Sequence, residues 1–351
     1  MRSFAEQLEQ LRKQAGFKIS ARGWAYQLEV LRLINKDQFD LVENLINTCR
    51  ASGVLPIDFT MEEEGRKFSG VDIPTKGSPV KYMGQYLKAA MNIEDFYTPK
   101  WWKGEKYYVQ MLVEKIDIKT LYSPVTEEYH IPIATAKGWS SMLQRAEYAR
   151  RFKEAEDNGL ECVLLYFGDF DPDGLRISDF LRGNLEDLSG IQWEDGTDGY
   201  EPSDLIIERF GLDYKTIMEL KLTWIDNLIT GSGKNLASPL HKNFKMDYVQ
   251  EYLRNYGARK CESNALVTMP KIARELCKTV IEGGIRGFGG LGKDAKDRFD
   301  ERYQEVVRIL DEFRERTGLD ESIEKALSII NQEGDERADD DDKDDNSDEE
   351  D

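Results

Sequence analysis

The sequence has few of the residues that bind transition metals or form disulfides. Its 351 residues include only two histidines and four cysteines, and the cysteines are widely separated, at Cys49, Cys162, Cys261 and Cys277. A structural zinc site needs closely spaced Cys and His ligands, so we expect none here. Scattered cysteines without a Cys-x-x-Cys pair are typical of a reduced, cytosolic protein.

A long apolar stretch is also missing. No run approaches the roughly 20 apolar residues that a membrane-spanning helix needs. Residues 1–20 are charged and helical in pattern, without the apolar centre of a signal peptide. We therefore expect a cytoplasmic protein, and the length of the chain allows two or three domains.

Positive charge is in the minority. The chain has 48 Lys and Arg against 67 Asp and Glu, a net charge of −19. Residues 333–351 contribute −11 of this, from 13 acidic and 2 basic residues, so that −8 remains for residues 1–332. Such a run is typical of a disordered acidic tail, with mimicry of DNA as the alternative. The remaining charge argues against a broad basic face, so any contact with DNA must come from local patches.

Residues 162–182 form the stretch that is most informative about chemistry. An apolar run over 162–167 is followed by carboxylates at alternate positions, Asp169, Asp171 and Asp173, and then by apolar residues at helical spacing. This order predicts a buried strand, an acidic turn and an amphipathic helix. Functional residues of open α/β sheets follow the carboxyl ends of strands, and clustered carboxylates there suit Mg²⁺.

This stretch has two other interpretations. An aspartate-rich turn that only caps a helix is common. A calcium-binding EF-hand loop also opens with aspartates at alternate positions, but it needs a glutamate at its twelfth position, where this chain has Phe180. A strand, moreover, is expected before this loop where an EF-hand has a helix.

The first 75 residues predict a small helical module. Helices are expected over 1–19, 21–34 and 37–52, with a short strand over 54–59. Ser20 is a suitable N-cap for the second helix, on which Arg22 and Tyr26 lie together because they are four residues apart. Three short helices and a strand indicate a helix-turn-helix or winged-helix fold, which commonly binds DNA.

From residue 106 onward the pattern alternates between strands and helices. Strands are expected over 107–113, 130–135, 162–167 and 205–210, with a long helix over 139–158. This succession predicts a parallel, doubly wound sheet. It places Glu114 and the aspartates at the carboxyl ends of two strands. The aromatic-rich residues 76–105 between the two regions are predicted to be an irregular linker.

Taken together, the motifs resemble the topoisomerase VI A subunit and its meiotic double-strand-break relatives. The resemblance covers roughly residues 15–285. It is carried by Ser20-x-Arg22-x-x-x-Tyr26, Glu114 within Val-Glu-Lys, Lys137-Gly138 followed by Arg145, Asp169-x-Asp171-Pro172-x-Gly174, and more weakly Glu262-x-x-Ala265-Leu266. The chain departs from the family pattern at Gly23, where the family usually has Glu, in its single Tyr26, and at Asp173, where Tyr is usual.

The resemblance implies a fold and a domain organisation. The fold would be α/β, with an N-terminal winged-helix domain followed by a Toprim domain, a Rossmann-like parallel sheet. The CAP-like winged-helix domain would span 1–75, the linker 76–105, and the Toprim domain with its C-terminal extension 106–320. Residues 321–351 would hold the end of a helix and the acidic tail. The chain would be a divergent, free-standing homologue of the A subunit.

The resemblance also implies a mechanism. Tyr26, assisted by Arg22, would attack DNA, and Glu114, Asp169 and Asp171 would hold Mg²⁺. Further roles would fall to Lys137 and Arg145 as DNA contacts and to Asp173 and Glu262 as accessory residues. In the family the tyrosine of one subunit meets the metal site of the other, so the resemblance implies a homodimer, associated with the nucleoid, that cuts both strands of double-stranded DNA. A separate ATPase subunit would be needed for strand passage.

A topoisomerase is an isomerase, and the sequence leaves two alternatives to this activity open. The first is a Toprim nuclease that hydrolyses DNA with water as the nucleophile, Tyr26 then having a structural role. The second is a DNA-binding regulator with a vestigial site, which the acidic and basic motif residues argue against.

Overall fold

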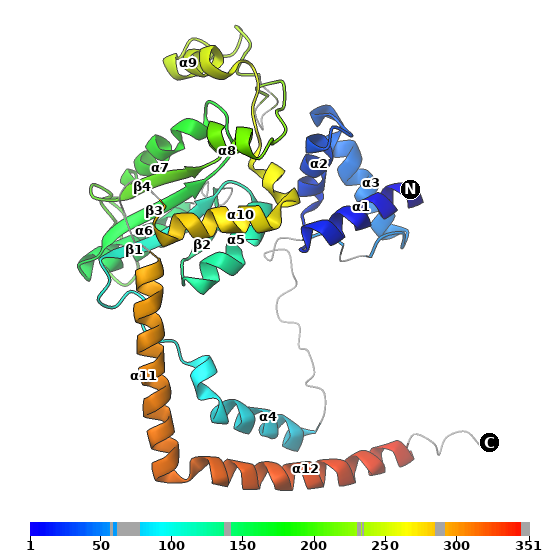
Figure 1. The fold of residues 1–351 in the computed structure, drawn as a ribbon, viewed down its shortest axis with the longest axis vertical. Helices are drawn as coiled ribbons and strands as arrows, with labels where there is room; N and C mark the ends of the chain where they lie inside the picture. Colours follow the sequence, from blue (N-terminus) through cyan, green and yellow to red (C-terminus); the bar gives the residue numbers. More distant parts are fainter. Residues whose placement is uncertain are drawn as a thin grey trace, which may run out of the picture. The chain divides into compact units, whose positions relative to one another are not determined.

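The computed structural model describes residues 1–56, 59–61, 78–136, 142–229, 233, 235–284 and 292–344. The protein is a mixed α/β structure, with helices around one parallel sheet (Figure 1). Contacts within the chain divide it into two compact units. The first unit comprises Met1–Glu64 and Gly104–Asp294, and the second comprises Gly65–Lys103 and Ala295–Asp351.

A four-stranded parallel sheet forms the centre of the first unit. Its strands have the order β2-β1-β3-β4, with β1 at Tyr107–Val113, β2 at Ile133–Thr135, β3 at Glu161–Phe167 and β4 at Ile206–Gly211. The central strands β1 and β3 pair in register along their whole length, from Tyr107 with Glu161 to Val113 with Phe167. Both are buried except at their first residue, as central parallel strands require. The predicted parallel sheet is confirmed.

Strand β2 is shorter than the predicted 130–135, for a reason visible in the backbone. The amide of Ile131 donates to the carbonyl of Thr126 (2.8 Å), which closes the end of the preceding helix α5 (Ile116–Glu128). His130 has a positive φ of 50° in this turn. The first residues of the predicted strand are therefore used to end a helix, and pairing with β1 begins only afterwards.

Helices cover the two faces of the sheet. Helix α5 leads from β1 to β2, α6 (Met142–Asp157) leads back from β2 to β3, and α7 (Ile177–Glu186) leads from β3 to β4. Because parallel crossovers are right-handed, α5 lies on one face and α6 and α7 on the other. Helix α10 (Pro270–Thr279) packs on α5. The shorter helices α8 (Tyr214–Glu219) and α9 (Asp247–Tyr256) lie between β4 and α10 in sequence.

The N-terminal part of the first unit contains the three predicted helices. They are α1 (Arg2–Ala15), α2 (Ala21–Val30) and α3 (Phe39–Ala51). The predicted N-cap is present, because the Ser20 hydroxyl accepts a hydrogen bond from the Gly23 amide (2.9 Å).

The small strand predicted over 54–59 is wrong for the residues that the structure describes there. The amides of Val54 and Leu55 both donate to the carbonyl of Cys49, at 2.9 and 3.0 Å, and so complete the end of α3. These donors are then not available to a neighbouring strand, and Phe59 lies in a bend. Residues 57–58 lie outside the described residues. The described part of this module is thus helical, without the strand expected of a winged helix.

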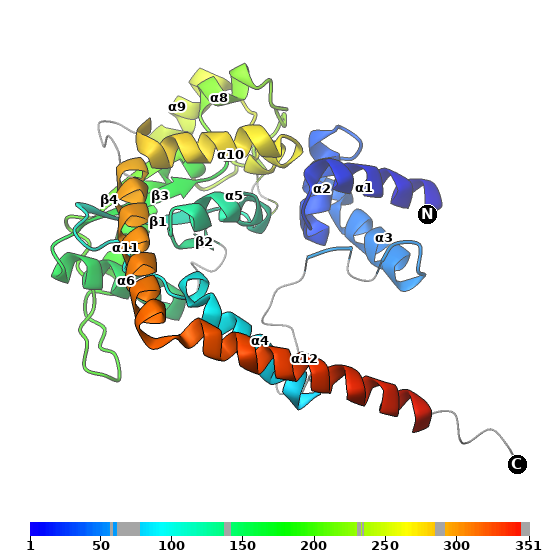
Figure 2. The ribbon, with the colours of Figure 1, turned by 60° about the horizontal axis from the view of Figure 1, so that its bottom comes forward.

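The second unit is built from segments that are far apart in the sequence. The supposed linker 76–105 contains the helix α4 (Pro79–Met91), which packs along α12 (Leu319–Asp344) (Figure 2). Gly84 allows this close packing, since a Cβ there would lie 3.3 Å from a methyl group of Ile330. The N-cap Ser78 and Pro79 at the first helical position begin α4 as such residues usually do. An irregular linker is therefore the wrong description.

The two C-terminal helices are longer than the helices that the sequence predicts over 298–316 and 320–331. Helix α11 spans Lys293–Thr317, and α12 continues to Asp344, into the acidic run that was expected to be disordered. No proline interrupts this segment to stop backbone hydrogen bonding. In the described part of the chain no helix is both long and apolar enough to cross a membrane, and the four cysteines are free and buried.

Candidate active site at the ends of β1 and β3

The ends of the two central strands bring two predicted site residues together. Glu114 follows β1, and its amide continues the ladder by donating to the carbonyl of Phe167 at the end of β3 (2.9 Å). The Glu114 side chain turns back over β3, where its Oε2 accepts the amide of Asp169 (2.7 Å). The parallel register of β1 and β3 thus sets this contact between residues 55 positions apart.

Gly168 makes this close approach possible. A Cβ at this position would lie 2.7 Å from Glu114 Oε2 and 2.5 Å from the hydroxyl of Tyr166. Both distances are too short for a carbon atom. Only glycine at position 168 therefore leaves room for the Glu114 carboxylate to lie against the backbone at the end of β3.

The carboxylates at this edge disfavour each other's charge. Burial, followed by the charge of Asp169, raises the pKa of Glu114 to about 8. The same two causes raise the pKa of Asp171 to about 6, although Asp171 Oδ1 accepts the amide of Gly174 (2.6 Å). Within the described residues neither Glu114 nor Asp171 forms an ion pair. A cation bound between them would relieve this repulsion.

Asp169, by contrast, has both of its carboxylate oxygens engaged. Its side chain is buried, with Oδ1 accepting the amide and the hydroxyl of Ser263, both at 2.7 Å. Oδ2 forms an ion pair with Lys115 Nζ (2.9 Å). Lys115, next in sequence to Glu114, therefore supplies the positive charge at Asp169.

Three lysines surround Glu262, the residue predicted as accessory. This lysine cluster consists of Lys36, Lys115 and Lys260, with Nζ of Lys36 at 3.1 Å and of Lys260 at 2.7 Å from Oε1, and Lys115 paired with Oε2. Burial alone would raise the pKa of Glu262, which is 2% exposed, but the lysine charges hold it well below its usual value. The charges of Asp169 and Glu262 raise the pKa of Lys115, although the burial of Lys115 alone would lower it.

Tyr26 lies against this lysine cluster, within the same chain. The ring centroid is 4.1 Å from Lys115 Nζ and 5.6 Å from Lys36 Nζ, and the ring of Phe39 meets it edge-on at 4.9 Å. Burial, with a further contribution from the charge of Glu262, raises the pKa of the Tyr26 hydroxyl, while Lys115 opposes this. The hydroxyl is therefore protonated at neutral pH in this arrangement.

Arg22 is held away from the acidic edge. Its guanidinium pairs with Glu43 (2.7 Å) and Asp40 (3.4 Å), both on α3, and lies 5.3 Å from the ring centroid of Phe39. Burial alone would lower the pKa of Arg22, but the bond to Glu43 and the charge of that carboxylate raise it. Arg22 thus ties α2 to α3 in this structure.

The remaining predicted site residues have separate surroundings. Asp173 Oδ1 accepts the hydroxyl of Tyr248, on α9, at 3.0 Å. Arg145 donates from Nη1 to Asn184 Oδ1 (2.9 Å), which links α6 to α7. Lys137 lies outside the described residues. Neither Asp173 nor Arg145 is brought into contact with Glu114 or Asp169 by these bonds.

Arg209, on β4, was not anticipated from the sequence. Its guanidinium donates from Nη2 to the carbonyl of Asp169 (2.9 Å) and from Nε to the carbonyl of Gly174 (3.0 Å). It therefore clamps both ends of the acidic turn onto the next strand. The available signal was a pair of charged residues, Glu208 and Arg209, inside a predicted strand. Lys115 had a comparable signal, because it directly follows Glu114.

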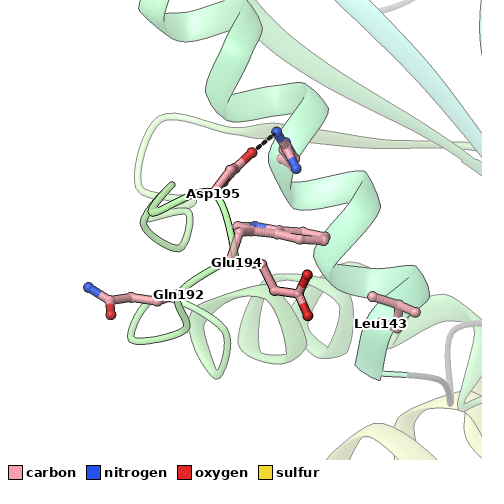
Figure 3. Close-up of a pocket in the computed structure, with 6 residues that line it drawn as sticks. Leu143, Gln192, Glu194 and Asp195 are labelled. Atoms are coloured by element: carbon pink, nitrogen blue, oxygen red, sulfur yellow. Dashed lines mark hydrogen bonds and ion pairs between the residues drawn. The ribbon is translucent and has the colours of Figure 1, made fainter.

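A cavity of about 510 Å³ lies between the start of α6 and the loop before β4 (Figure 3). It is lined by Leu143, Arg150, Gln192, Trp193, Glu194 and Asp195. Arg150 stacks at 4.9 Å from the ring centroid of Trp193 and bonds to Asp195 (2.6 Å). The cavity contains none of the predicted catalytic or metal-binding residues, so its size does not identify it as the active site.

The fit of a metal ion can be judged from the carboxylates. Among the residues that the structure describes, no three His, Cys, Asp or Glu side chains are arranged around one point as metal ligands. The carboxylates at the strand ends nevertheless suit a hard divalent cation. Glu114 and Asp171 are oxygen donors with raised pKa values, and neither has a cationic partner among the described residues. Asp169 would have to exchange Lys115 for the metal.

Comparison with known proteins adds no assignment to this geometry. No protein-family model matches the chain, and neither does any curated protein or solved structure. The functional argument therefore rests on the residues of the site itself.

Proposed function

We propose that the protein cleaves DNA by Mg²⁺-dependent transesterification through Tyr26, in the manner of a type IIB topoisomerase A subunit. One observation carries the proposal. Tyr26 lies 4.1 Å from Lys115 Nζ, and Lys115 is paired with Asp169 at the acidic edge of the sheet. A candidate nucleophile, a cation and the carboxylates thus come from three distant segments and lie together in one compact unit.

The chemistry asked of Tyr26 is displacement at phosphorus. A phenol with a pKa of about 10 or above is a weak nucleophile at neutral pH and needs nearby positive charge. Lys115 and Lys36 supply two ammonium groups at the ring. Attack breaks the O–H bond of Tyr26, whose proton is released to solvent, and forms a bond between the Tyr26 oxygen and the 5′ phosphate. It breaks the bond from phosphorus to the 3′ oxygen, which takes up a proton and leaves as a hydroxyl.

The carboxylates have the second part of the task. Glu114, Asp169 and Asp171 would hold Mg²⁺, which neutralises negative charge on the phosphate and on the leaving oxygen. If Asp169 served as a ligand, Lys115 would keep only Glu262 of its two carboxylate partners. Its ammonium group would then be freer to stabilise the phenolate of Tyr26 beside it.

Partners follow from the same proposal. Arg22, Arg145 and Lys137 would contact the phosphate backbone, and two copies of the chain would be needed to cut both strands. Strand passage would require a separate ATPase subunit. These roles belong to the proposal and can be tested separately from cleavage.

A covalent protein–DNA adduct is the decisive product. The protein is incubated with supercoiled double-stranded DNA and Mg²⁺, and adducts are trapped with denaturant and separated on a gel. Tyr26→Phe should abolish the adduct, whereas Tyr86→Phe, an exposed tyrosine on α4, should leave it unchanged. An adduct that persists in Tyr26→Phe excludes Tyr26 as the nucleophile.

A hydrolytic nuclease is the second candidate, and one observation favours it. The pKa of Tyr26 is raised by burial, and its ring packs edge-on against Phe39 as a structural tyrosine would. Water would then attack phosphorus, with the same carboxylates holding Mg²⁺. Cleavage without an adduct, unchanged in Tyr26→Phe, supports this candidate over the first. Asp169→Ala should stop cleavage by either route.

A further inference from the structure

The helix that carries Tyr26 has a gap in its surface at Gly23. Gly23 is buried within α2, and a Cβ added there would lie 2.0 Å from Oδ2 and 2.7 Å from Cγ of Asp117. No side chain fits at that distance. The carboxylate of Asp117, which comes from α5, therefore fills the space that a side chain at position 23 would occupy.

Asp117 is bonded on both of its oxygens. It is 2% exposed, and Oδ1 accepts the amide of Ser20, the N-cap of α2, at 3.1 Å. Oδ2 accepts Nδ2 of Asn264 at 3.3 Å. The carbonyl of Asn264 in turn accepts Nε2 of Gln27, further along α2, at 2.7 Å. One face of α2 is thus joined at its start to α5, through Ser20, and further along to residues 263–268, through Gln27.

These contacts fix how α2 is rotated relative to α5 and to residues 263–268. Ser20, Gly23 and Gln27 are spaced by three and four residues, so they share one face of the helix. Tyr26 is three residues beyond Gly23, and with α2 held in this position its ring centroid lies 4.1 Å from Lys115 Nζ.

We infer that Asp117 is a positioning residue, which holds the Tyr26 helix against α5 and residues 263–268 of the same chain by filling the space left by Gly23. This seat for α2 is polar and needs a matched shape, since a buried carboxylate is tolerated only where its oxygens are bonded. Its role in cleavage rests on the proposed function. The seating itself does not, because it can be measured without DNA.

A purely structural role would be a general contribution to folding. Loss of Asp117 would then speed hydrogen exchange throughout the first unit. A seat specific to α2 predicts faster exchange in α2 alone, with helix α6 of the same unit as the internal control.

The test compares four variants of the full chain. Gly23→Ala and Asp117→Ala should each speed amide exchange in α2 about tenfold or more, and lower the yield of the covalent adduct by a similar factor. Asp117→Asn should make amide exchange in α2 no faster than in the wild type and should keep the adduct yield near the wild-type level, because its carbonyl can still accept the Ser20 amide. The double variant Gly23→Asp with Asp117→Gly returns a carboxylate to the same space from the other side. The double variant should recover most of the protection from amide exchange in α2 that Gly23→Ala and Asp117→Ala each lose.

Several results would overturn the inference. One is Gly23→Ala with wild-type exchange in α2, and another is equal loss of protection in α6 and α2. A third is faster exchange in α2 with an unchanged adduct, which would remove the role in positioning Tyr26. If the double variant does not fold, Asp117→Asn against Asp117→Ala makes the same comparison. If the wild type forms no adduct, the proposed function fails, and the exchange comparison still decides the seat.

Discussion

Asp117 offers a prediction whose size can be worked out from the structure. Burial raises its pKa from the ordinary value of 3.8 to about 6, although the Ser20 amide and Lys115 oppose this. At 1.36 kcal/mol for each pH unit, this pKa difference makes the folded protein about 3 kcal/mol more stable with Asp117 protonated than with Asp117 ionised. Because the pKa is higher in the folded protein, this stabilisation is fully present below about pH 4. It is lost as the pH rises to about 6.

The Asp117→Asn variant removes this pH dependence while keeping an acceptor for the Ser20 amide. Asn264 now donates from Nδ2 to Asp117, so its side-chain amide must turn over in the variant; Asn264 Oδ1, a buried oxygen without a hydrogen-bond partner, can then accept the new amide. We expect the variant to match the wild type near pH 4 and to exceed its free energy of unfolding by up to about 3 kcal/mol at pH 7.

Urea unfolding of both proteins, followed by circular dichroism at intervals from pH 4 to pH 8, measures this difference. The matched control is Thr48→Ala, a change of an exposed residue on α3 that does not titrate, so its difference from the wild type should be independent of pH. The reasoning is refuted if Asp117→Asn is less stable than the wild type at pH 7. It is also refuted if the difference between them does not change across this range.

Three further predictions concern the acidic edge. Lys115→Met should lower the free energy of unfolding by about 3 kcal/mol, because it leaves two buried carboxylates without a shared cation. Urea unfolding measures this loss, and Lys106→Met, a change of an exposed lysine, serves as the control. Gly168→Ala should displace the Glu114 side chain and slow DNA cleavage about tenfold or more, and an unchanged rate on a gel would contradict it. Asp173→Asn should leave the Mg²⁺ concentration for half-maximal cleavage within about twofold, since its partner is a tyrosine; a larger rise would make it a ligand.

The parts of the fold that follow local rules could be predicted from the sequence. Strand β1 has the predicted bounds, and β3 differs from its prediction by one residue, because continuous apolar runs mark central parallel strands. The contact of Glu114 with Asp169 follows from the same parallel arrangement. The predictions failed where two uses compete for one backbone group, as at Val54, whose amide closes a helix and is not available to a strand.

The helix α4 shows a different kind of failure. Its aromatic-rich sequence resembles an irregular connection, although Ser78 and Pro79 mark a helix start. Its partner α12 lies more than 200 residues further along the chain. A helix that is stabilised by packing against so distant a segment gives little local signal of its own.

The sequence by itself determined the alternation of strands and helices, the acidic turn after β3 and the presence of Tyr26 on an N-capped helix. These depend on residues within a few positions of one another. Only the tertiary structure decided that Lys115 links Asp169 to Glu262, that Tyr26 lies beside this pair in its own chain, and that Asp117 fills the gap at Gly23. Buried charges and buried spaces are matched across distant segments, and their partners are therefore settled only when the segments pack.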